Sequence, residues 1–415
     1  MSKPLVLFTL AGTNSRLFPF NQGIHKSGLT LLGKPLLVRT IQQFLDRGFD
    51  RFVIVLSPHD HPERGIKATL KKYFPDLQVT YSEQTEATGM GDAILAAREH
   101  LSEPFVYTSG YHLQAAEIAE KMMDFPYPNV VCSTTTRHPW HYGILTLEND
   151  LAIGITEKPT KGTEASNQKI QTIYWLDLEF VDVLATTKTD SEYSFEAALN
   201  TLMKERKVGR LELDDCLASL KYPWHIFDIQ TELFSQLKSH RADTARISSS
   251  AVLDETEGPI VVEAGAVIND FAKIVGPAYI GENCLVGDYA FVRKSSLEAN
   301  TKVGAKTEVV RSVLLEDVSI HFGYLADSIV GNKVTIGAGL ITANKRLDRQ
   351  PVEVEVKSQG IDTGRNNVGA LIGDESVIGI RVNLMPGVVL APKTTVFPAT
   401  TVYKNTEAGQ FVKPT

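Results

Sequence analysis

An aliphatic residue recurs every six positions along much of the second half of the chain. The residues of this repeat are Val262, Ile268, Ile274, Ile280, Val286 and Val292, then Val330 and Ile336, then Ile372, Ile378, Leu384, Leu390, Val396 and Val402. Neither the 3.6-residue period of a helix nor the two-residue period of a strand generates this spacing. A coil that places one short strand on each side of a triangular prism does, because each inward aliphatic side chain stacks on that of the next coil. The pattern predicts a parallel β-helix, built from hexapeptide repeats, over residues 251–415.

The first half of the chain alternates between strand and helix patterns. An unbroken apolar run at Leu5–Leu10 is typical of a strand that is buried on both faces of a parallel sheet. Residues 37–45 then carry a helical apolar stripe, and a second buried strand is predicted at Phe52–Leu56. Further strands are predicted at Phe105–Thr108, Asn129–Ser133 and Ile173–Leu176. This order indicates a Rossmann-like α/β domain over residues 1–235, which binds ligands beyond the carboxyl ends of its strands.

A polar stretch, Gln236–Thr244, separates the two patterns and predicts a linker helix within residues 236–250. The total of 415 residues agrees with two domains, because a single core rarely grows beyond about 250–300 residues. The net charge of −7 argues against a nucleic-acid or membrane partner. The start of the chain lacks a signal-peptide pattern, no apolar run approaches the ~18 residues that span a bilayer, and the three cysteines are far apart. We therefore expect a cytoplasmic protein.

The loop after the first strand carries candidate phosphate-binding chemistry. It reads Leu10-Ala-Gly-Thr-Asn-Ser-Arg-Leu-Phe-Pro19, and Lys26 follows. Small residues let backbone amides approach phosphate oxygens, and the Arg16 guanidinium and the Lys26 ammonium add positive charge. A glycine-bearing turn of this kind is also common without any ligand, so the loop alone does not decide between the two interpretations.

Five landmarks in order make the first half resemble the sugar-1-phosphate nucleotidylyltransferases. They are Arg16 to Pro19 with Lys26 and Lys34-Pro35, then Gln84 with Thr88-Gly-Met-Gly-Asp-Ala93, then Tyr142-Gly143, Glu157-Lys-Pro159 and Ile173-Tyr174. The resemblance implies an α/β nucleotidyltransferase domain that binds a nucleoside triphosphate, UTP or dTTP, and a sugar 1-phosphate. It also implies catalytic roles for Arg16 and Lys26. The implied nucleotide contacts are Ala11, Gly12, Gln84 and Gly89, and the implied sugar-phosphate contacts are Gly143, Glu157 and Lys158.

The resemblance departs from the family at the expected magnesium site. The first metal-binding aspartate of the family corresponds to Tyr111, and Asn14 stands in place of a family glycine. Asp228 still matches the second metal position. A neutral phenol is a poor magnesium ligand, so we expect an impaired nucleotidyl step.

The β-helix half resembles the acetyltransferase domain of the bifunctional uridylyltransferase/acetyltransferase enzymes of the archaeal type. The resemblance is carried by His321-Phe-Gly-Tyr324 and by Ile336-Gly-Ala-Gly-Leu-Ile-Thr-Ala-Asn344, with a polar insertion after it. It implies a left-handed β-helix, His321 as the general base, Arg293 and Tyr324 as sugar-phosphate contacts, and Asn344 on the acetyl-CoA side. A histidine of ordinary pKa, near ~6.5, can take the proton that an amino sugar loses before it attacks a thioester.

Three functions remain open from the sequence. The first is a bifunctional sugar-1-phosphate nucleotidylyltransferase and glucosamine-1-phosphate N-acetyltransferase of UDP-N-acetylglucosamine-type biosynthesis. The second is an enzyme with only one of these activities, and the third is a non-catalytic regulatory subunit that senses nucleotide sugars. The resemblance of the β-helix also implies a homotrimer that shares its acetyl-CoA sites between subunits.

Overall fold

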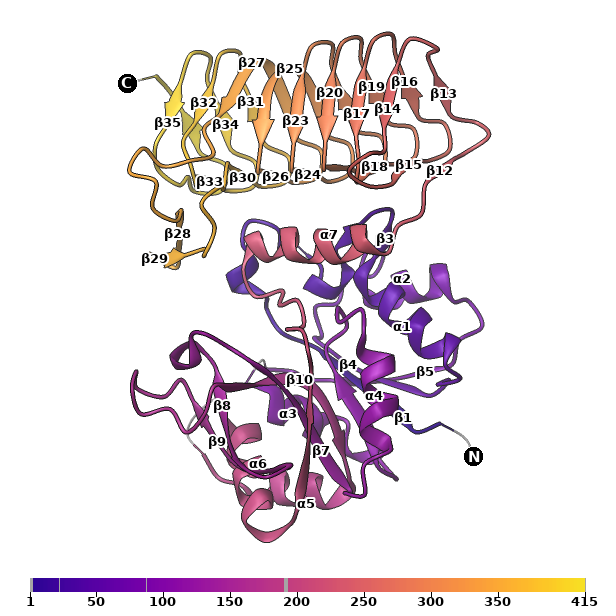
Figure 1. Ribbon diagram of the computed structural model, residues 1–415, viewed down its shortest axis with the longest axis vertical. Coiled ribbons are helices and arrows are strands. Elements are labelled where there is room, and N and C mark those ends of the chain that lie inside the picture. Colours follow the sequence, from indigo (N-terminus) through magenta and orange to yellow (C-terminus); the bar gives the residue numbers. More distant parts are fainter. Residues whose placement is uncertain (1–2, 22, 87, 190–192, 415) are drawn as a thin grey trace. The chain divides into compact units, whose positions relative to one another are not determined.

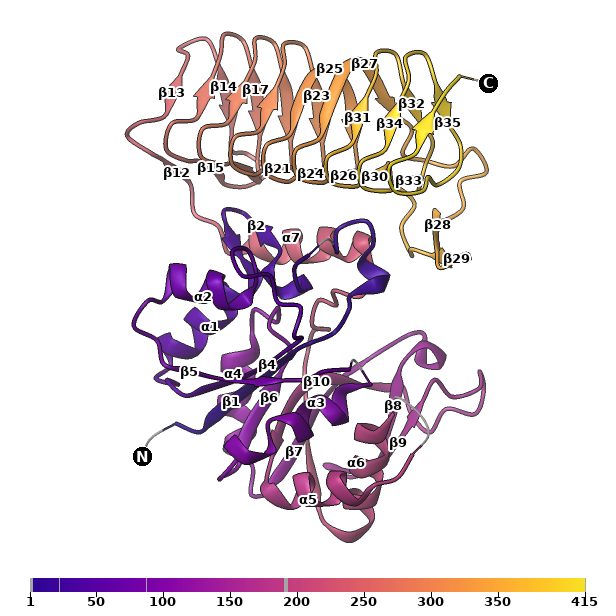
Figure 2. The same ribbon diagram turned by 180° about the vertical axis from the view of Figure 1, so that it is seen from behind.

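The computed structural model describes residues 3–21, 23–86, 88–189 and 193–414 (Figures 1 and 2). The chain divides into two compact units. The first unit comprises residues 1–13, 23–29 and 35–217, and the second comprises residues 14–22, 30–34 and 218–415. The first unit therefore ends earlier than the predicted boundary at residue 235, and two short segments of the N-terminal region belong to the second unit.

A nine-stranded sheet forms the centre of the first unit, in the order β5-β4-β1-β6-β10-β7-β11-β9-β8. Its strands are β1 (Leu5–Leu10), β4 (Phe52–Leu56), β5 (Val79–Glu83), β6 (Phe105–Thr108), β7 (Asn129–Thr135), β8 (Gly143–Glu148), β9 (Leu151–Glu157), β10 (Gln168–Leu176) and β11 (Val208–Glu212). The strands predicted from the sequence are confirmed. Strands β5, β4, β1 and β6 run parallel, so their carboxyl ends meet at one edge.

Helices cover both faces of this sheet. They are α1 (Leu36–Asp46), α2 (Ile66–Tyr73), α3 (Met90–Ala96), α4 (Ala115–Met123), α5 (Leu178–Thr186) and α6 (Ser194–Glu205). Because side chains alternate along a strand, Phe8 of β1 joins the core under α1, α2 and α4, whereas Leu7 joins the core under α3, α5 and α6. The apolar stripe of α1 is buried as predicted, with Phe44 packed edge-on against Phe8.

The second unit is a β-helix whose coils stack in parallel register. One face consists of β12 (His240–Arg241), β15 (Ile260–Val262), β18 (Ala278–Ile280), β21 (Ser296–Leu297), β24 (Val313–Leu314), β26 (Ile329–Val330), β30 (Leu371–Ile372) and β33 (Val389–Leu390). The other faces consist of β13 (Arg246–Ile247), β14 (Val252–Asp254), β16 (Val267–Ile268), β17 (Lys273–Val275), β19 (Leu285–Val286), β20 (Phe291–Arg293), β22 (Lys302–Val303), β23 (Glu308–Val310), β25 (Ser319–Ala326), β27 (Thr335–Thr342), β31 (Val377–Ile378), β32 (Asn383–Leu384), β34 (Thr395–Val396), β35 (Thr401–Val402) and β36 (Phe411–Val412).

The six-residue repeat is the core of this β-helix, as predicted. All of its members from Val262 to Val402 belong to one buried aliphatic cluster. The coil turns its corners at residues in the left-handed conformation, such as Asn283, Tyr289 and Lys294. The corner residues point outward, so the coil can accept polar or charged side chains there without disturbing the core.

The linker helix predicted within residues 236–250 is wrong. A helix, α7 (Ile226–Ser235), precedes this segment, and β12 and β13 within it pair with β15 and β16 as the first coil. Helix α7 packs on the β-helix, where Gln230 donates hydrogen bonds from Nε2 to Ser296 Oγ at 3.1 Å and to the Ser312 carbonyl at 3.3 Å. The local sequence resembles a helix, but backbone pairing with the next coil determines its structure.

The polar insertion after Asn344 forms a hairpin of β28 (Glu353–Val356) and β29 (Gln359–Asp362). A short ladder joins β2 (Thr30–Leu31) and β3 (Lys34–Pro35). Within the described ranges, no helix is long and apolar enough to cross a membrane.

One histidine lies in the interior of the first unit, directly after Tyr111. His112 is 3% exposed, and its Nε2 lies 3.0 Å from Thr172 Oγ1. Burial, with a smaller contribution from the Lys26 ammonium, lowers the pKa of His112 to about 3. This imidazole is therefore neutral in the folded protein near neutral pH.

His112 should make the protein less stable as the pH falls. The unfolded chain protonates this residue near its ordinary pKa of ~6.5, whereas the folded chain does not, so stability is complete above pH ~6.5 and declines toward pH 3. The loss at pH 5 is about 2 kcal/mol. The substitution His112→Gln, which cannot titrate, should remove that part of the pH dependence in urea unfolding. The exposed His59→Gln is the control, and an equal slope in wild type and H112Q would contradict the assignment.

Gly304 is required because the next coil passes very close to it. A Cβ added there would clash with the carbonyl oxygen of His321. We expect Gly304→Ala to lower the free energy of unfolding by about 1–3 kcal/mol, because neighbouring coils cannot separate without breaking the ladder. Gly360→Ala is the matched control, since an added Cβ there meets only the end of the Glu353 side chain, at 3.3 Å. Equal unfolding midpoints in urea for the two variants would refute this account.

Candidate functional site

The predicted nucleotide contacts lie at the carboxyl edge of the parallel strands in the first unit. Ala11 and Gly12 follow β1, and a Cβ added to Gly12 would meet nothing within 4 Å. Gln84 follows β5, and its Nε2 donates a hydrogen bond to the Gly89 carbonyl at 3.1 Å. Gly89 has a φ of 134°, which a side chain rarely permits, and it leads into α3. The protein does not need glycine at position 12 for its own packing, so the space beside it is available to a ligand.

Lys26 and Tyr111 are in contact at the same edge. The Lys26 ammonium lies 4.7 Å from the centre of the Tyr111 ring, and the ring itself is 7% exposed. A cation over an aromatic face is held by the quadrupole of the ring. The tyrosine thus supports the lysine at the position where the resemblance implies a metal-binding carboxylate.

Two further tyrosines lie under this edge, of which Tyr174 was named from the sequence only as a family landmark and Tyr107 was missed. Tyr107 of β6 and Tyr174 of β10 stack with ring centres 5.6 Å apart, and the Tyr107 hydroxyl lies 2.9 Å from Thr9 Oγ1. Burial raises the pKa of Tyr174 well above its usual value, with smaller contributions from Glu196 and from Glu157. The sequence did contain a signal for Tyr107, because side chains alternate along β6 and this alternation places Tyr107 on the face opposite Val106.

The predicted sugar-binding residues are brought together by the β8–β9 hairpin. Gly143 pairs with Glu157, and a Cβ added to Gly143 would lie 2.7 Å from Glu157 Oε2. Lys158 has a φ of 45°, and its backbone amide donates to the Tyr142 carbonyl at 3.0 Å. Its ammonium donates to the Tyr193 hydroxyl at 3.4 Å. The hairpin thus brings Gly143, Glu157 and Lys158 together, and their role in binding a sugar phosphate stays a prediction.

Arg16 and Asp228 belong to the second unit. Arg16 is exposed in a 3₁₀ turn that begins after Asn14, whose φ of 53° is one that asparagine tolerates better than most residues. Asn14 therefore adopts a left-handed backbone conformation although it stands in place of a family glycine. Asp228 lies in the first turn of α7 and forms an ion pair with Arg365. Burial raises the pKa of this carboxyl, and the Arg365 guanidinium opposes the shift.

The two residues that match the metal positions of the family, Tyr111 and Asp228, are engaged in other contacts. In the part of the chain that the structure describes, no group of three or more His, Cys, Asp or Glu side chains is arranged to hold a metal ion. Tyr111 is supporting Lys26, and Asp228 is paired with Arg365. A magnesium ion at either position would require these contacts to rearrange.

The predicted acetyl-transfer residues lie on neighbouring coils of the β-helix. Strand β23 pairs with β20 on one side and with β25 on the other, so Arg293, Val310 and Ala326 form one row, and Phe291, Glu308 and Tyr324 form the next. His321 lies in the first half of β25 with its side chain exposed. Partial burial, followed by the Glu308 carboxylate, raises the pKa of Tyr324, so this phenol stays a hydrogen-bond donor.

Arg293 carries a buried donor that no other group satisfies. Its Nε is buried and finds no hydrogen-bond partner among the residues that the structure describes. Leaving such a group unpaired costs about 1–3 kcal/mol, which an anionic ligand would recover. The geometry therefore favours Arg293 as an anion-binding residue.

Asp327 organises the side chains at the end of this strand. This carboxylate is 6% exposed and accepts hydrogen bonds from Arg311 Nε at 2.6 Å, from Arg311 Nη2 at 2.7 Å and from Asn344 Nδ2 at 2.5 Å. The amide of Asn344 is therefore fixed in orientation. The sequence contains no local signal for this network, because Asp327 is 16 residues from Arg311 and 17 from Asn344.

Known proteins match this chain in both units. The Nucleotidyl transferase family matches residues 3–215. The bifunctional protein GlmU of Methanocaldococcus jannaschii is 28% identical over 409 residues, which are 97% of this chain and 95% of that protein. A bifunctional sugar-1-phosphate nucleotidylyltransferase/acetyltransferase of Sulfurisphaera tokodaii is 27% identical over 97% of this chain and 98% of its own length.

A shorter relative matches with higher identity. The Escherichia coli K12 protein YaiX, named as an uncharacterized acetyltransferase, is 36% identical over 186 residues, which are 44% of this chain and 81% of that protein. The family match to residues 3–215 covers just over half of the sequence. The chain therefore belongs to the nucleotidyl transferase family.

Proposed function

We propose that the protein is an enzyme of nucleotide-sugar biosynthesis with two substrate-binding units. The β-helix transfers the acetyl group of acetyl-CoA to glucosamine 1-phosphate. The first unit binds the resulting sugar 1-phosphate with UTP or dTTP and carries out an impaired nucleotidyl step. The observation that carries this proposal is the unsatisfied Nε of Arg293, which lies one coil from Glu308 and two coils from Tyr324.

Acetyl transfer follows from the chemistry of these side chains. Arg293 would bind the phosphate of the acceptor, and the Tyr324 hydroxyl would donate a hydrogen bond to it. The imidazole of His321 would take one proton from the ammonium of the sugar. The free amine then attacks the thioester carbonyl carbon, the nitrogen loses its second proton to solvent, the carbon–sulfur bond breaks, and the departing CoA sulfur receives the proton from His321. Asn344, oriented by Asp327, would bind the acetyl-CoA side.

The first unit binds phosphate groups, for which Lys26 supplies positive charge. The catalytic role implied for Arg16, which belongs to the second unit, stays a prediction. Magnesium would neutralise the triphosphate in a reaction of this kind, but the side chains at Tyr111 and Asp228 do not fit it, so we derive no step through the metal. The support that Tyr111 gives to Lys26 also favours the second candidate function, a nucleotide-sugar sensor.

A homotrimer is part of the proposal. Large apolar side chains remain exposed along the β-helix around the acetyl-transfer residues, with Phe322 at 44% beside His321 and Ile341 at 51% paired with Tyr324. Exposed apolar groups beside a polar site are typical of an interface. Packing of a second copy there would exclude water from the thioester. The cytoplasmic location expected from the sequence is likewise retained as a proposal.

Loss of the base should stop acetyl transfer. With acetyl-CoA and glucosamine 1-phosphate, the wild-type protein should release free CoA thiol, and His321→Ala should lower kcat by about 10²–10⁴-fold. Arg293→Gln should mainly raise KM for the sugar phosphate, because it removes binding that is present before and during the reaction. The exposed His138→Ala, in the first unit, is the control.

Release of pyrophosphate on the same preparation separates the alternatives. With UTP or dTTP, N-acetylglucosamine 1-phosphate and magnesium, we expect a rate at least about 100-fold below that of acetyl transfer, since an electrostatic contribution of that size is missing. Comparable rates would show that another carboxylate replaces Tyr111. Silence in both assays, with binding of a nucleotide sugar, would favour the sensor.

The trimer is tested by sedimentation equilibrium. We expect three copies of the 45.7 kDa chain in the wild-type protein. The double substitution Phe322→Ser with Ile341→Ser should shift the population toward smaller species, because it removes apolar area from the proposed interface. The double substitution Lys393→Ser with Lys404→Ser is the control, and a wild-type monomer would refute this part of the proposal.

A further inference from the structure

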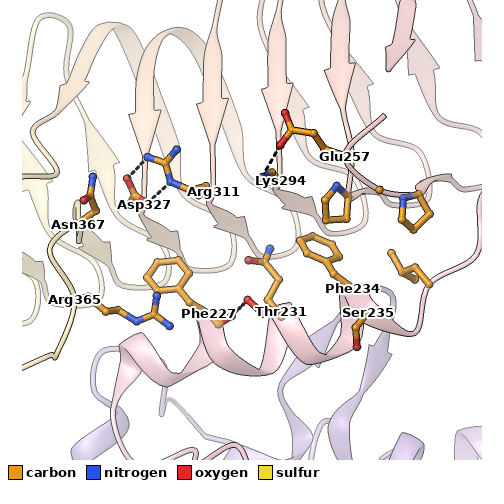
Figure 3. Close-up of a pocket in the computed structure, with 15 residues that line it drawn as sticks. Phe227, Thr231, Phe234, Ser235, Glu257, Lys294, Arg311, Asp327, Arg365 and Asn367 are labelled. Atoms are coloured by element: carbon orange, nitrogen blue, oxygen red, sulfur yellow. Dashed lines mark hydrogen bonds and ion pairs between the residues drawn. The ribbon is translucent and has the colours of Figure 1, made fainter. Parts of the chain in front are cut away.

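A cavity of about 510 Å³ lies within the second unit, between α7 and one corner of the β-helix (Figure 3). The corner is formed by Lys294, Arg311 and Asp327, which occupy equivalent positions on three successive coils and all have a φ between 45° and 50°. We refer to these three residues as the corner row. Arg293, His321 and Tyr324 do not line this cavity, whereas Asp327, which orients Asn344, does, so the cavity adjoins the proposed acetyl-transfer site without containing its base.

Three cations reach the cavity from different segments. Lys294 and Arg311 come from the corner row, and Arg365 comes from the segment after the β28–β29 hairpin. Each has one acidic partner: Glu257 lies 2.6 Å from Lys294, Asp327 binds Arg311, and Asp228 binds Arg365. The side chains of these two pairs are 40% and 48% exposed for Lys294 with Glu257 and 31% and 48% exposed for Arg365 with Asp228, and ion pairs that water reaches are weak.

The cations keep donors that their partners do not use. Arg311 contacts Asp327 through Nε and Nη2, which leaves Nη1, and the pair of Arg365 uses only Nη2. Lys294 has three N–H groups and one carboxylate partner. Several N–H groups from three side chains therefore remain for an anion with several oxygens.

The rest of the lining is apolar and contains rings. Phe227 and Phe234 rise from α7 toward the corner of the β-helix (Figure 3), and Pro259 and Pro277 belong to the lining as well. The guanidinium of Arg365 lies 5.3 Å from the centre of the Phe227 ring, which joins the apolar and the cationic parts of the lining. A flat ring fits between aromatic and proline side chains, because both present apolar faces.

We propose that this cavity binds a small organic phosphate that carries a flat ring, the chemistry of a nucleoside 5′-monophosphate. The phosphate would contact Lys294, Arg311 and Arg365, and the ring would lie against Phe227 and Phe234. The volume lies in the range of small-molecule sites. A phosphate dianion suits three separate cations better than a carboxylate, which offers two oxygens and one charge. Bound there, the ligand would link α7 to the β-helix and to the segment after the hairpin.

Isothermal titration calorimetry of the whole protein with AMP tests this site. We expect saturable binding with one AMP per chain, and at least a tenfold higher Kd in Lys294→Gln and in Arg365→Gln. The matched control is Lys302→Gln, which removes the same charge from an exposed lysine of β22 outside the lining and should leave the Kd unchanged. Thermal unfolding of each variant verifies that it is folded.

Further probes decide between ligands and locations. Inorganic phosphate should bind more weakly than AMP, and equal affinity would overturn the role of the ring. Octanoate binding in place of AMP would overturn the phosphate assignment. AMP binding that is unchanged in both variants lies elsewhere and also overturns the proposal.

The thiol-release assay keeps this inference apart from the proposed function. If the two variants fail to affect AMP but raise KM for glucosamine 1-phosphate, the cavity belongs to the acceptor site and the inference is wrong. If AMP binds as expected while no thiol is released, the cavity assignment stands and the acetyltransferase proposal fails.

Discussion

The backbone ladder between successive coils is the constraint on which the second unit depends. Parallel strands lie ~4.8 Å apart, so equivalent positions of successive coils are stacked at that interval. Inward positions then form one continuous aliphatic core. The same constraint places outward residues in rows, which is why Phe291, Glu308 and Tyr324 are neighbours although about 16 residues separate them along the chain.

The rows explain why charged groups gather on this unit. A charged side chain on one coil always lies next to the residues at the equivalent positions of the two adjacent coils. Arg311 at the corner thus meets Asp327 of the next coil, and Asp327 in turn meets Asn344. Arg293 differs, because its neighbour in the row is Val310, which offers no acceptor side chain. The two arginines therefore differ in their partners: Arg311 is held by Asp327 through Nε and Nη2, whereas the buried Nε of Arg293 has no partner among the residues that the structure describes.

The sequence predicted the parts of the fold that depend on periodic burial. The six-residue aliphatic repeat and the apolar stripe of α1 each indicate which side chains face a core. The six-residue spacing is interrupted between Val292 and Val330 because some sides of the prism are one residue shorter, as in the step from Val292 to Leu297. The aliphatic residues of this stretch, such as Leu297, Val303 and Val309, are nevertheless buried in the same cluster. The helix predicted after Gln236 was wrong for a related reason, since pairing of His240 with Val261 is a long-range contact that local composition does not contain.

The contacts between the candidate site residues could not be predicted from the sequence. Resemblance pointed to Tyr111 as a departure, yet only the structure places the Lys26 ammonium over its ring. In the family pattern a carboxylate at this position would attract both the lysine and a metal ion. A neutral ring holds the lysine without adding negative charge, so the edge of the sheet stays cationic. Such a cationic edge attracts phosphate groups, and a neutral phenol there is a poor ligand for magnesium.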